Sequence, residues 1–263
     1  MKNTNVFDSD LNPVIEIASN EDLGILVEYL SGKFSETLTT SDAYKKHNPE
    51  HIEYADLIAK EIREMGGNSL VNVFRGEGPS YKGIVCDVAD KLKAPYNKTK
   101  PIEDIENSIL ETILRQTLDK MTDEQKNELL KEFDDKAGLN KAGITTATLI
   151  TIFKAGGFKS YQLTLIIANQ IAKMILGHGL RFATNASLTR ALAILTGPVG
   201  WAITGIWTAV DIAGPSYKVT IPSVIHVAML RKKLNSITCN SCEAILPDPS
   251  IKFCPECGAK ISQ

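Results

Sequence analysis

The sequence predicts an all-α protein, a multi-helix bundle that ends in a small cysteine-rich tail. Three observations lead to this fold class. Apolar residues recur at helical spacing through most of the chain, and capping residues stand where several of these segments begin. Four of the five cysteines fall within nineteen residues near the C-terminus. With 263 residues, of which 43% are apolar, the chain can bury one large core and still hold a small appendage.

Charge divides the chain into two unequal halves. Residues 141–263 hold 12 basic and 4 acidic side chains, a net charge of +8, whereas residues 1–140 carry −10. A basic half can meet an anionic partner such as lipid or nucleic acid, or the two halves can pack together and neutralise each other. Both interpretations stay open. The polar N-terminus, Met1–Asp10, lacks the features of a secretory signal, so we expect a cytoplasmic protein, with peripheral attachment to the inner membrane as an extension.

The N-terminal helices are predicted from residues that cap helix N-termini and from glycines that end helices. Ser19 precedes two acidic residues and an apolar face up to Leu30, which is typical of a capped helix start. A polar linker is expected over 35–49, and then an amphipathic helix over 52–65 that the Gly66-Gly67 pair ends. A Gly-Pro-Ser-Tyr-Lys sequence opens the next helix at position 78 and recurs at position 214. Two similar helical units or chance would both produce this repeat.

The middle of the chain contains the strongest helical pattern. Residues 102–121 carry apolar side chains at a period near 3.6, namely Ile105, Ile109, Leu110, Ile113, Leu114 and Leu118. Thr122 and Gln125 then form a capping box, which predicts a further helix to about residue 136. Charges alternate on the outer faces of both helices, as on a solvated surface.

An apolar, basic region follows. Residues 147–153 fit a helix or a strand, whereas residues 161–176 have clear helical spacing. Residues 219–234 predict a helix that is apolar on one side and ends in three cations, Arg231, Lys232 and Lys233. We expect the acidic helices of residues 1–140 to pack on or beside these apolar helices.

Between these helices lies a Gly/Ala-rich segment that predicts an antiparallel helical hairpin. Residues 191–210 carry no charge, and a Gly-Pro-Val-Gly turn at 197–200 divides them. A helix needs about 20 residues to cross a bilayer. The whole uncharged segment reaches that length, but each of the two arms of the hairpin is much shorter. We favour a buried hairpin over one that enters a membrane. In the membrane alternative the contacts are Pro198, Trp201, Trp207 and the cations Arg231, Lys232 and Lys233.

The tail contains the most specific motif of the chain. Cys239 and Cys242 form one CxxC pair, and Cys254 and Cys257 form a second pair eleven residues later. Four thiolates at this spacing predict a closed tetrahedral site for structural Zn²⁺. Gly258 lets the second turn bring backbone amides towards the sulfurs. A disulfide framework needs a secreted context, and a redox CxxC needs a thioredoxin-like setting, and the sequence shows neither.

Catalytic motifs are not found. The histidines, His47, His51, His178 and His226, share no motif spacing with Cys86 or with an acid. His47 and His51 have the spacing of one helix face, but Pro49 lies between them. Cys86 lies in an apolar helical pattern, where a core thiol is the expected role. We therefore expect a protein that is not an enzyme.

Several stretches resemble the YaaW-like family of bacterial proteins. They are Gly66-Gly67-Asn68-Ser69 with Arg75-Gly76, Tyr81 with Asp87-Val88 and Lys91-Leu92, Gly197-Pro198-Val199-Gly200, and Tyr217 with Val219-Thr220-Ile221-Pro222. This family is grouped distantly with ubiquinol–cytochrome c chaperones, which implies partner binding near membranes and supplies no catalytic residues. Separately, Lys252–Lys260 resembles the second knuckle of a zinc ribbon, which is an addition to the family pattern.

These observations predict three regions, an acidic helical region over 1–140, an apolar helical region with the hairpin over 141–234, and a zinc ribbon over 235–263. The expected function is that of a non-enzymatic interaction or chaperone-like protein, in which the ribbon binds a protein partner and the hairpin meets a client or an anionic membrane. Two alternatives stay open. One is a membrane-disrupting, pore-forming effector, and the other is a nucleic-acid-binding regulator that uses the ribbon and the basic helix end.

Overall fold

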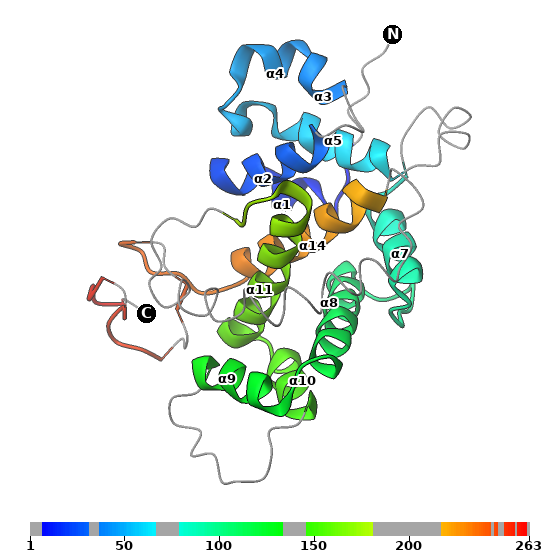
Figure 1. The fold of residues 1–263 in the computed structure, drawn as a ribbon. Helices are drawn as coiled ribbons and strands as arrows, with labels where there is room; N and C mark the ends of the chain where they lie inside the picture. Colours follow the sequence, from blue (N-terminus) through cyan, green and yellow to red (C-terminus); the bar gives the residue numbers. More distant parts are fainter. Residues whose placement is uncertain are drawn as a thin grey trace.

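The computed structural model describes residues 7–31, 37–66, 79–133, 146–180, 217–242, 245–246, 250–255 and 257–261. Within these ranges the regular structure is helical, and the only β-type pairs are two isolated bridges in the C-terminal tail. The prediction of an all-α multi-helix protein is confirmed. Figure 1 shows the helices gathered around one long helix, with the tail at one side.

Short helices form the N-terminal end of the molecule. They are α1 (Asn12–Glu16), α2 (Asn20–Leu30), α3 (Thr37–Thr40), α4 (Asp42–His47), the 3-10 helix η1 (His51–Tyr54) and α5 (Ala55–Met65). Ser19 caps α2 as predicted, because its hydroxyl accepts a hydrogen bond from the amide of Asp22. The linker expected over 35–49 is wrong, since it contains α3 and α4. Leu38 is fully buried in the core, and Ser41 is the N-cap of α4. This polar stretch therefore packs against the body and forms helices.

Two of the three central helices, α7 (Tyr81–Leu92) and α9 (Asp123–Phe133), begin at side-chain caps, whereas α8 (Ile102–Asp119) begins after Pro101 without one. Ser80, not Pro79, is the N-cap of α7, so the proline lies just outside the helix. The long helix α8 follows, and α9 starts at the predicted capping box. There the amide of Thr122 donates to Gln125 Oε1 at 2.9 Å, and the amide of Gln125 donates to Thr122 Oγ1 at 3.3 Å.

The ambivalent segment 147–153 is helical and belongs to α10 (Thr146–Lys154). It packs against α8 and against α11 (Gly157–Leu176). Gly156 separates α10 from α11 with a φ of +75°, and Gly177 ends α11 with a φ of +81°. Both angles lie in the left-handed region, where a side chain is strained, so glycine is the natural residue at each break.

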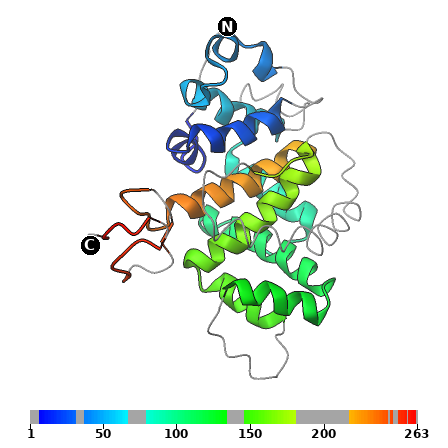
Figure 2. The same cartoon turned by 60° about the vertical axis from the view of Figure 1, so that its left-hand side comes forward.

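The last helix, α14 (Tyr217–Leu234), lies at the centre of the molecule and contacts α1, α2, α5, α7, α8 and α11 (Figures 1 and 2). Every residue from Val219 to Leu230 is buried. The prediction of a single apolar side is therefore wrong. Helices surround α14, so its polar residues as well as its apolar ones lie inside the fold.

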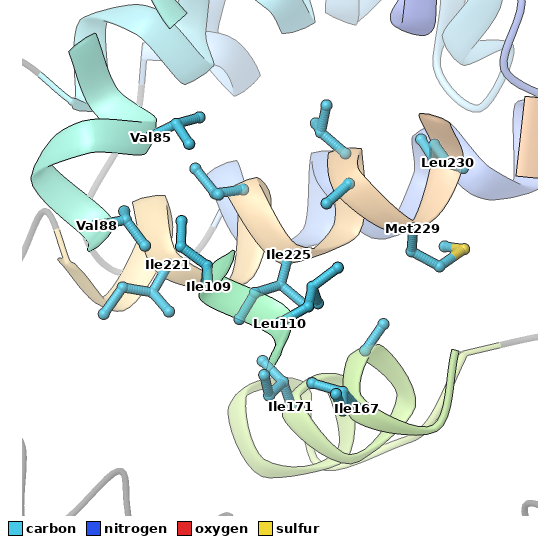
Figure 3. Close-up of a cluster of buried hydrophobic side chains, with 14 of the residues drawn as sticks. Val85, Val88, Ile109, Leu110, Ile167, Ile171, Ile221, Ile225, Met229 and Leu230 are labelled. Carbon is cyan, nitrogen blue, oxygen red and sulfur yellow. The ribbon is translucent and has the colours of Figure 1, made fainter. Parts of the chain in front are cut away.

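The main core forms where α14 meets the helices around it. Figure 3 shows apolar side chains of α7, α8 and α11 meeting those of α14. They are Val85 and Val88 of α7, Ile109 and Leu110 of α8, Ile167 and Ile171 of α11, and Ile221, Ile225, Met229 and Leu230 of α14. Side chains from both the acidic and the basic parts of the sequence thus share one buried cluster, and α14 is the element that joins them.

The predicted hairpin, with Pro198, Trp201 and Trp207, lies outside the described residues. The same is true of the Gly-Pro part of the second Gly-Pro-Ser-Tyr-Lys repeat. In the described ranges, no helix combines the length and the apolar character needed to cross a membrane.

Candidate metal centre

The C-terminal tail folds into two tight turns, each carrying one CxxC pair. An antiparallel bridge between Thr238 and Ile245 closes the first turn, and one between Phe253 and Lys260 closes the second. In the second turn, the Gly258 amide donates to the Cys254 carbonyl at 2.9 Å, and Gly258 has a φ of +72°. Gly258 thus makes the expected turn, because only a residue without a side chain adopts this angle at little cost. The approach of backbone amides to the sulfurs of this second turn stays a prediction.

The two turns bring all four cysteine sulfurs together. The Sγ atoms of Cys239 and Cys257 are 3.7 Å apart, and so are those of Cys242 and Cys254. All four sulfurs lie within 4.8 Å of one another. A disulfide would hold its sulfurs at about 2.05 Å, so these cysteines are free thiols.

These distances fit a tetrahedral metal ion. A metal–sulfur bond of about 2.3 Å, as zinc makes, gives a sulfur–sulfur edge of about 3.8 Å in a regular tetrahedron. The 3.7 Å separations match that edge across both turns. Among the described residues, the donor set is four sulfurs and includes neither a histidine nor a carboxylate. Cys239, Cys242, Cys254 and Cys257 therefore form a cluster that suits a metal ion such as zinc.

Backbone amides favour the thiolate form within this cluster. The amide of Ser241 donates to the sulfur of Cys239 at 3.4 Å. This hydrogen bond lowers the pKa of Cys239 to about 7. Burial acts in the opposite direction, and the Cys242 amide and the neighbouring thiols add smaller lowering effects. A thiolate is the form that binds metal, so the turn prepares the ligand electrostatically as well as geometrically.

The tail has very little core of its own. Its small cluster of buried side chains holds Cys239, Leu246 and Cys254, with Ile251, Ala259 and Ile261 packed at the edge. A cluster of this size offsets little of the chain entropy lost on folding, so a metal ion held by the four sulfurs would add much to the stability of the tail. The prediction that residues 235–263 form a zinc ribbon is not confirmed, because the described residues of the tail contain two isolated bridges and no strand.

Ile245 connects the tail to the core of the helical body. Ile245 is 7% exposed and belongs to the main core, whereas its neighbour Leu246 packs among the cysteines. The Leu246 amide donates to the Ile237 carbonyl at 2.8 Å. The metal centre is therefore seated against the body near the end of α14, as Figure 2 shows.

The three cations at the end of α14 contact groups of the same chain. Arg231 pairs with Glu106 of α8, and Lys233 pairs with Asp22 of α2. Lys232 Nζ lies 3.2 Å from Ser160 Oγ of α11 and 5.0 Å from the centroid of the Phe153 ring. The predicted contact of these three residues with a membrane or partner stays a prediction. Their observed role is to bind α14 to four neighbouring helices, α2, α8, α10 and α11.

A buried polar network that sequence reasoning missed surrounds Arg231. Its Nε donates to Glu106 Oε2 at 2.8 Å, and the Tyr81 hydroxyl donates to Glu106 Oε1 at 2.9 Å. The Tyr81 amide donates to Asp8 Oδ2 at 2.7 Å, and Arg231 also reaches the Asp10 carbonyl. The network thus ties the N-terminal segment to α7, α8 and α14.

Burial and pairing oppose each other in this network. Burial raises the pKa of Glu106, while the charge and hydrogen bonds of Arg231 and the Tyr81 hydroxyl act against that rise. Burial alone would lower the pKa of Arg231, but the Glu106 carboxylate outweighs it and raises that pKa. The sequence did contain one sign of this buried network. Glu106 stands four residues after Ile102 and three before Ile109, so its carboxylate occupies an apolar position of the helix.

The histidines and Cys86 lie outside the sulfur cluster. His178 Nε2 is 2.7 Å from Glu28 Oε2, and His226 Nε2 is 3.1 Å from the Asp22 carbonyl. His51 contacts the hydroxyl of Tyr54. Cys86 is 7% exposed and belongs to the main core, which confirms the prediction of a buried core thiol.

Comparison with known proteins places this chain in a family. A family model described as ubiquinol-cytochrome C chaperone matches residues 50–225, more than half of the chain. A UPF0174 protein of Helicobacter pylori strain J99 is 47% identical over 234 residues, which cover 86% of this chain and 92% of the relative. The chain belongs to the UPF0174 family.

Other members of the UPF0174 family are more distant. A further UPF0174 protein from the same Helicobacter pylori strain is 38% identical over 208 residues, 77% of this chain and 99% of the relative. The UPF0174 protein YaaW of Escherichia coli strain K12 is 32% identical over 240 residues, 87% of this chain and 96% of the relative. The predicted resemblance to YaaW-like proteins is confirmed. No solved structure matches the chain.

Proposed function

We propose that this UPF0174 protein is a non-enzymatic, chaperone-like interaction protein whose C-terminal module is organised by a structural zinc ion. The observation that carries the proposal is the closed set of four sulfurs within 4.8 Å. A tetrahedral ion held by four thiolates has no open position for a substrate, which is the arrangement of structural zinc. Zinc would hold the two turns of the tail together, with Cys239, Cys242, Cys254 and Cys257 as its ligands.

The chaperone part of the proposal is supported by the family model, whose description is that of a ubiquinol-cytochrome C chaperone over residues 50–225. A chaperone needs surfaces that bind other proteins without chemistry. The sequence supplies no pattern of a nucleophile with its base, which agrees with such a role. Residues 50–225 lie before the metal centre, so helical body and tail would serve different purposes.

The tail presents the side chains that a docking module needs. Phe253 is 61% exposed on the second turn, and Ile237 is 49% exposed where α14 leads into the first. Lys252 and Lys260 are exposed on either side of Phe253 in the paired turn. An exposed aromatic side chain on a small rigid platform is a common anchor in protein interfaces. We propose that Phe253 is the main contact of the tail with a protein partner.

A light-scattering assay tests this proposal. The zinc-loaded full chain is added while a chemically denatured model client is diluted into buffer, and we expect it to suppress aggregation. Phe253→Ser should weaken that suppression. Ile52→Ser is the matched control, because Ile52 of η1 is 52% exposed but lies on the helical body, and this variant should act like the wild type. Equal suppression by all three proteins would remove Phe253 from the proposal, and no suppression in molar excess would refute the chaperone role.

Membrane engagement by the hairpin is a separate part of the proposal, and it rests on sequence. Flotation of the full chain with anionic liposomes, compared with the chain lacking residues 188–213, tests it. Flotation lost with the deletion, while the helical circular dichroism of the remaining chain persists, would support contact with a membrane. Flotation unaffected by the deletion, or absent from both proteins, would contradict it. We do not extend the proposal to nucleic acids, because Arg231 and Lys233 are paired with carboxylates of the same chain.

A further inference from the structure

A cleft of about 370 Å³ lies where the C-terminal module meets the helical body. Its walls come from α8, from the start of α11, from the end of α14 and from the residues that lead into the metal centre. Clefts that bind small molecules have volumes of about 300–1,000 Å³, so this space is large enough for a small ligand. It is separate from the sulfur cluster, and residues far apart in the sequence form it.

Two cations line the cleft, and they differ in their partners. Arg231 is neutralised by the carboxylate of Glu106. Lys232 is half-buried, and none of the ion pairs found among the described residues includes it. The ammonium group instead contacts two neutral groups of the described residues, the Ser160 hydroxyl at 3.2 Å and the face of the Phe153 ring. Burial lowers the pKa of Lys232, with a partial opposing effect from Glu106, as expected for a desolvated ammonium group.

The remaining lining is suited to a ligand with an apolar part. Phe158, Ala228, Ile237 and Leu246 offer apolar surface, and Asn107 and Asn235 offer amide groups. Glu103 also lines the cleft and is exposed, so it would repel a second negative charge on a bound molecule. The combination of one uncompensated cation, apolar walls and a nearby carboxylate selects for a single negative charge at one end of the ligand.

We propose that this cleft binds a small monocarboxylate with an apolar tail. The carboxylate would pair with Lys232 and accept hydrogen bonds from the neighbouring amides. The tail would lie against Phe158, Ile237 and Leu246. Because Ile237 and Leu246 belong to the segment that leads into the cysteine turns, the site joins the helical body to the C-terminal module.

Isothermal titration of the full chain with octanoate tests the proposal, with octan-1-ol and octylamine as uncharged and cationic probes of similar length. We expect octanoate to bind most tightly. Lys232→Met, which keeps the apolar stem and removes the charge, should weaken octanoate binding by at least about tenfold, because a charge-assisted hydrogen bond is lost.

Lys233→Met is the matched control. It removes the same charge one residue further along, but Lys233 pairs with Asp22 and does not line the cleft. Octanoate binding to this variant should equal that of the wild type. The proposal is overturned if Lys232→Met binds octanoate as the wild type does, if Lys233→Met loses binding equally, or if the wild type binds no octanoate at millimolar concentration.

Discussion

The guanidinium Nε of Arg231 lies 2.8 Å from Oε2 of Glu106, and the two residues are 125 positions apart in the chain. Both side chains are nearly excluded from solvent, with 11% and 3% of their surface exposed. This pair fixes the end of the central helix α14 to α8 beside the proposed ligand cleft. We therefore expect this buried ion pair to contribute to the stability of the helical body.

Removing one member of this buried pair should lower the free energy of unfolding much more than removing one member of a surface pair. Arg231→Met leaves the Glu106 carboxylate buried without its counter-ion, and we expect a loss of about 3–5 kcal/mol in the free energy of unfolding. Lys60→Met is the control, because Lys60 and Glu64 form an exposed pair on α5 at 3.7 Å. Urea denaturation should show a change of about 0.5 kcal/mol or less for this control. Similar losses in both variants would contradict the structural role of Arg231.

The Tyr81 hydroxyl supports the same carboxylate from the other side. Tyr81→Phe keeps the fully buried ring and removes only the donor to Glu106. We expect a loss of about 1–2 kcal/mol, since a buried acceptor loses one partner. Tyr96→Phe removes a comparable bond to Asp90 at an exposed site and should have little effect on urea denaturation. A neutral result for Tyr81→Phe would mean that Glu106 does not depend on this hydroxyl.

His226 should make the stability of the fold fall as the pH is lowered. It lies on α14 and is 1% exposed, and this burial lowers its pKa from 6.5 to about 4. The nearby Asp22 opposes the shift, and the charge of Lys233 adds a smaller lowering effect. Between these two values the unfolded chain takes up a proton that the folded chain does not. Stability is therefore complete above about pH 6.5 and is lost as the pH falls towards 4.

The size of this effect can be measured against a variant that does not titrate. From pH 7 to pH 5, His226 should contribute a loss of roughly 2 kcal/mol. His226→Met should show a pH dependence that is smaller by this amount in urea denaturation followed by circular dichroism. Parallel pH profiles for the two proteins would show that His226 is equally able to take up a proton in the folded state.

Loss of one cysteine ligand should affect the tail and leave the body folded. Cys254→Ser removes one of four thiolates, so we expect the chain to release its metal and the two turns to separate. The helical circular dichroism should remain nearly unchanged, because the main core consists largely of residues outside the tail. Cys86→Ala, which changes a cysteine in the body, should retain the metal. Collapse of the helical signal in Cys254→Ser would show that the tail is required for the core.

Local features were the part of the fold that the sequence predicted well. The cap at Ser19, the capping box of Thr122 with Gln125 and the turn at Gly258 each depend on residues within a few positions of one another. The four-cysteine cluster was predictable for the same reason, because two CxxC pairs at short spacing have few other uses in a reducing compartment.

Features that depend on tertiary packing were missed. The polar residues of α14 suggested a solvent-facing side, yet His226, Thr220 and Ser223 are buried because helices surround this element. The pairing of Glu106 with Arg231 and the cleft beside it need the mutual placement of α8, α11 and α14, which no local pattern contains. Glu106 did carry a signal, as a charged residue among the apolar positions of α8, but its partner could not be read from spacing.

X-ray absorption at the zinc edge tests the central claim most directly. The full chain, purified under reducing conditions and measured together with its metal content, should contain one zinc ion per molecule. The scattering shell should fit four sulfur atoms at about 2.3 Å. Absence of stoichiometric zinc, or a shell that requires nitrogen or oxygen ligands in place of sulfur, would contradict a structural zinc centre formed by Cys239, Cys242, Cys254 and Cys257.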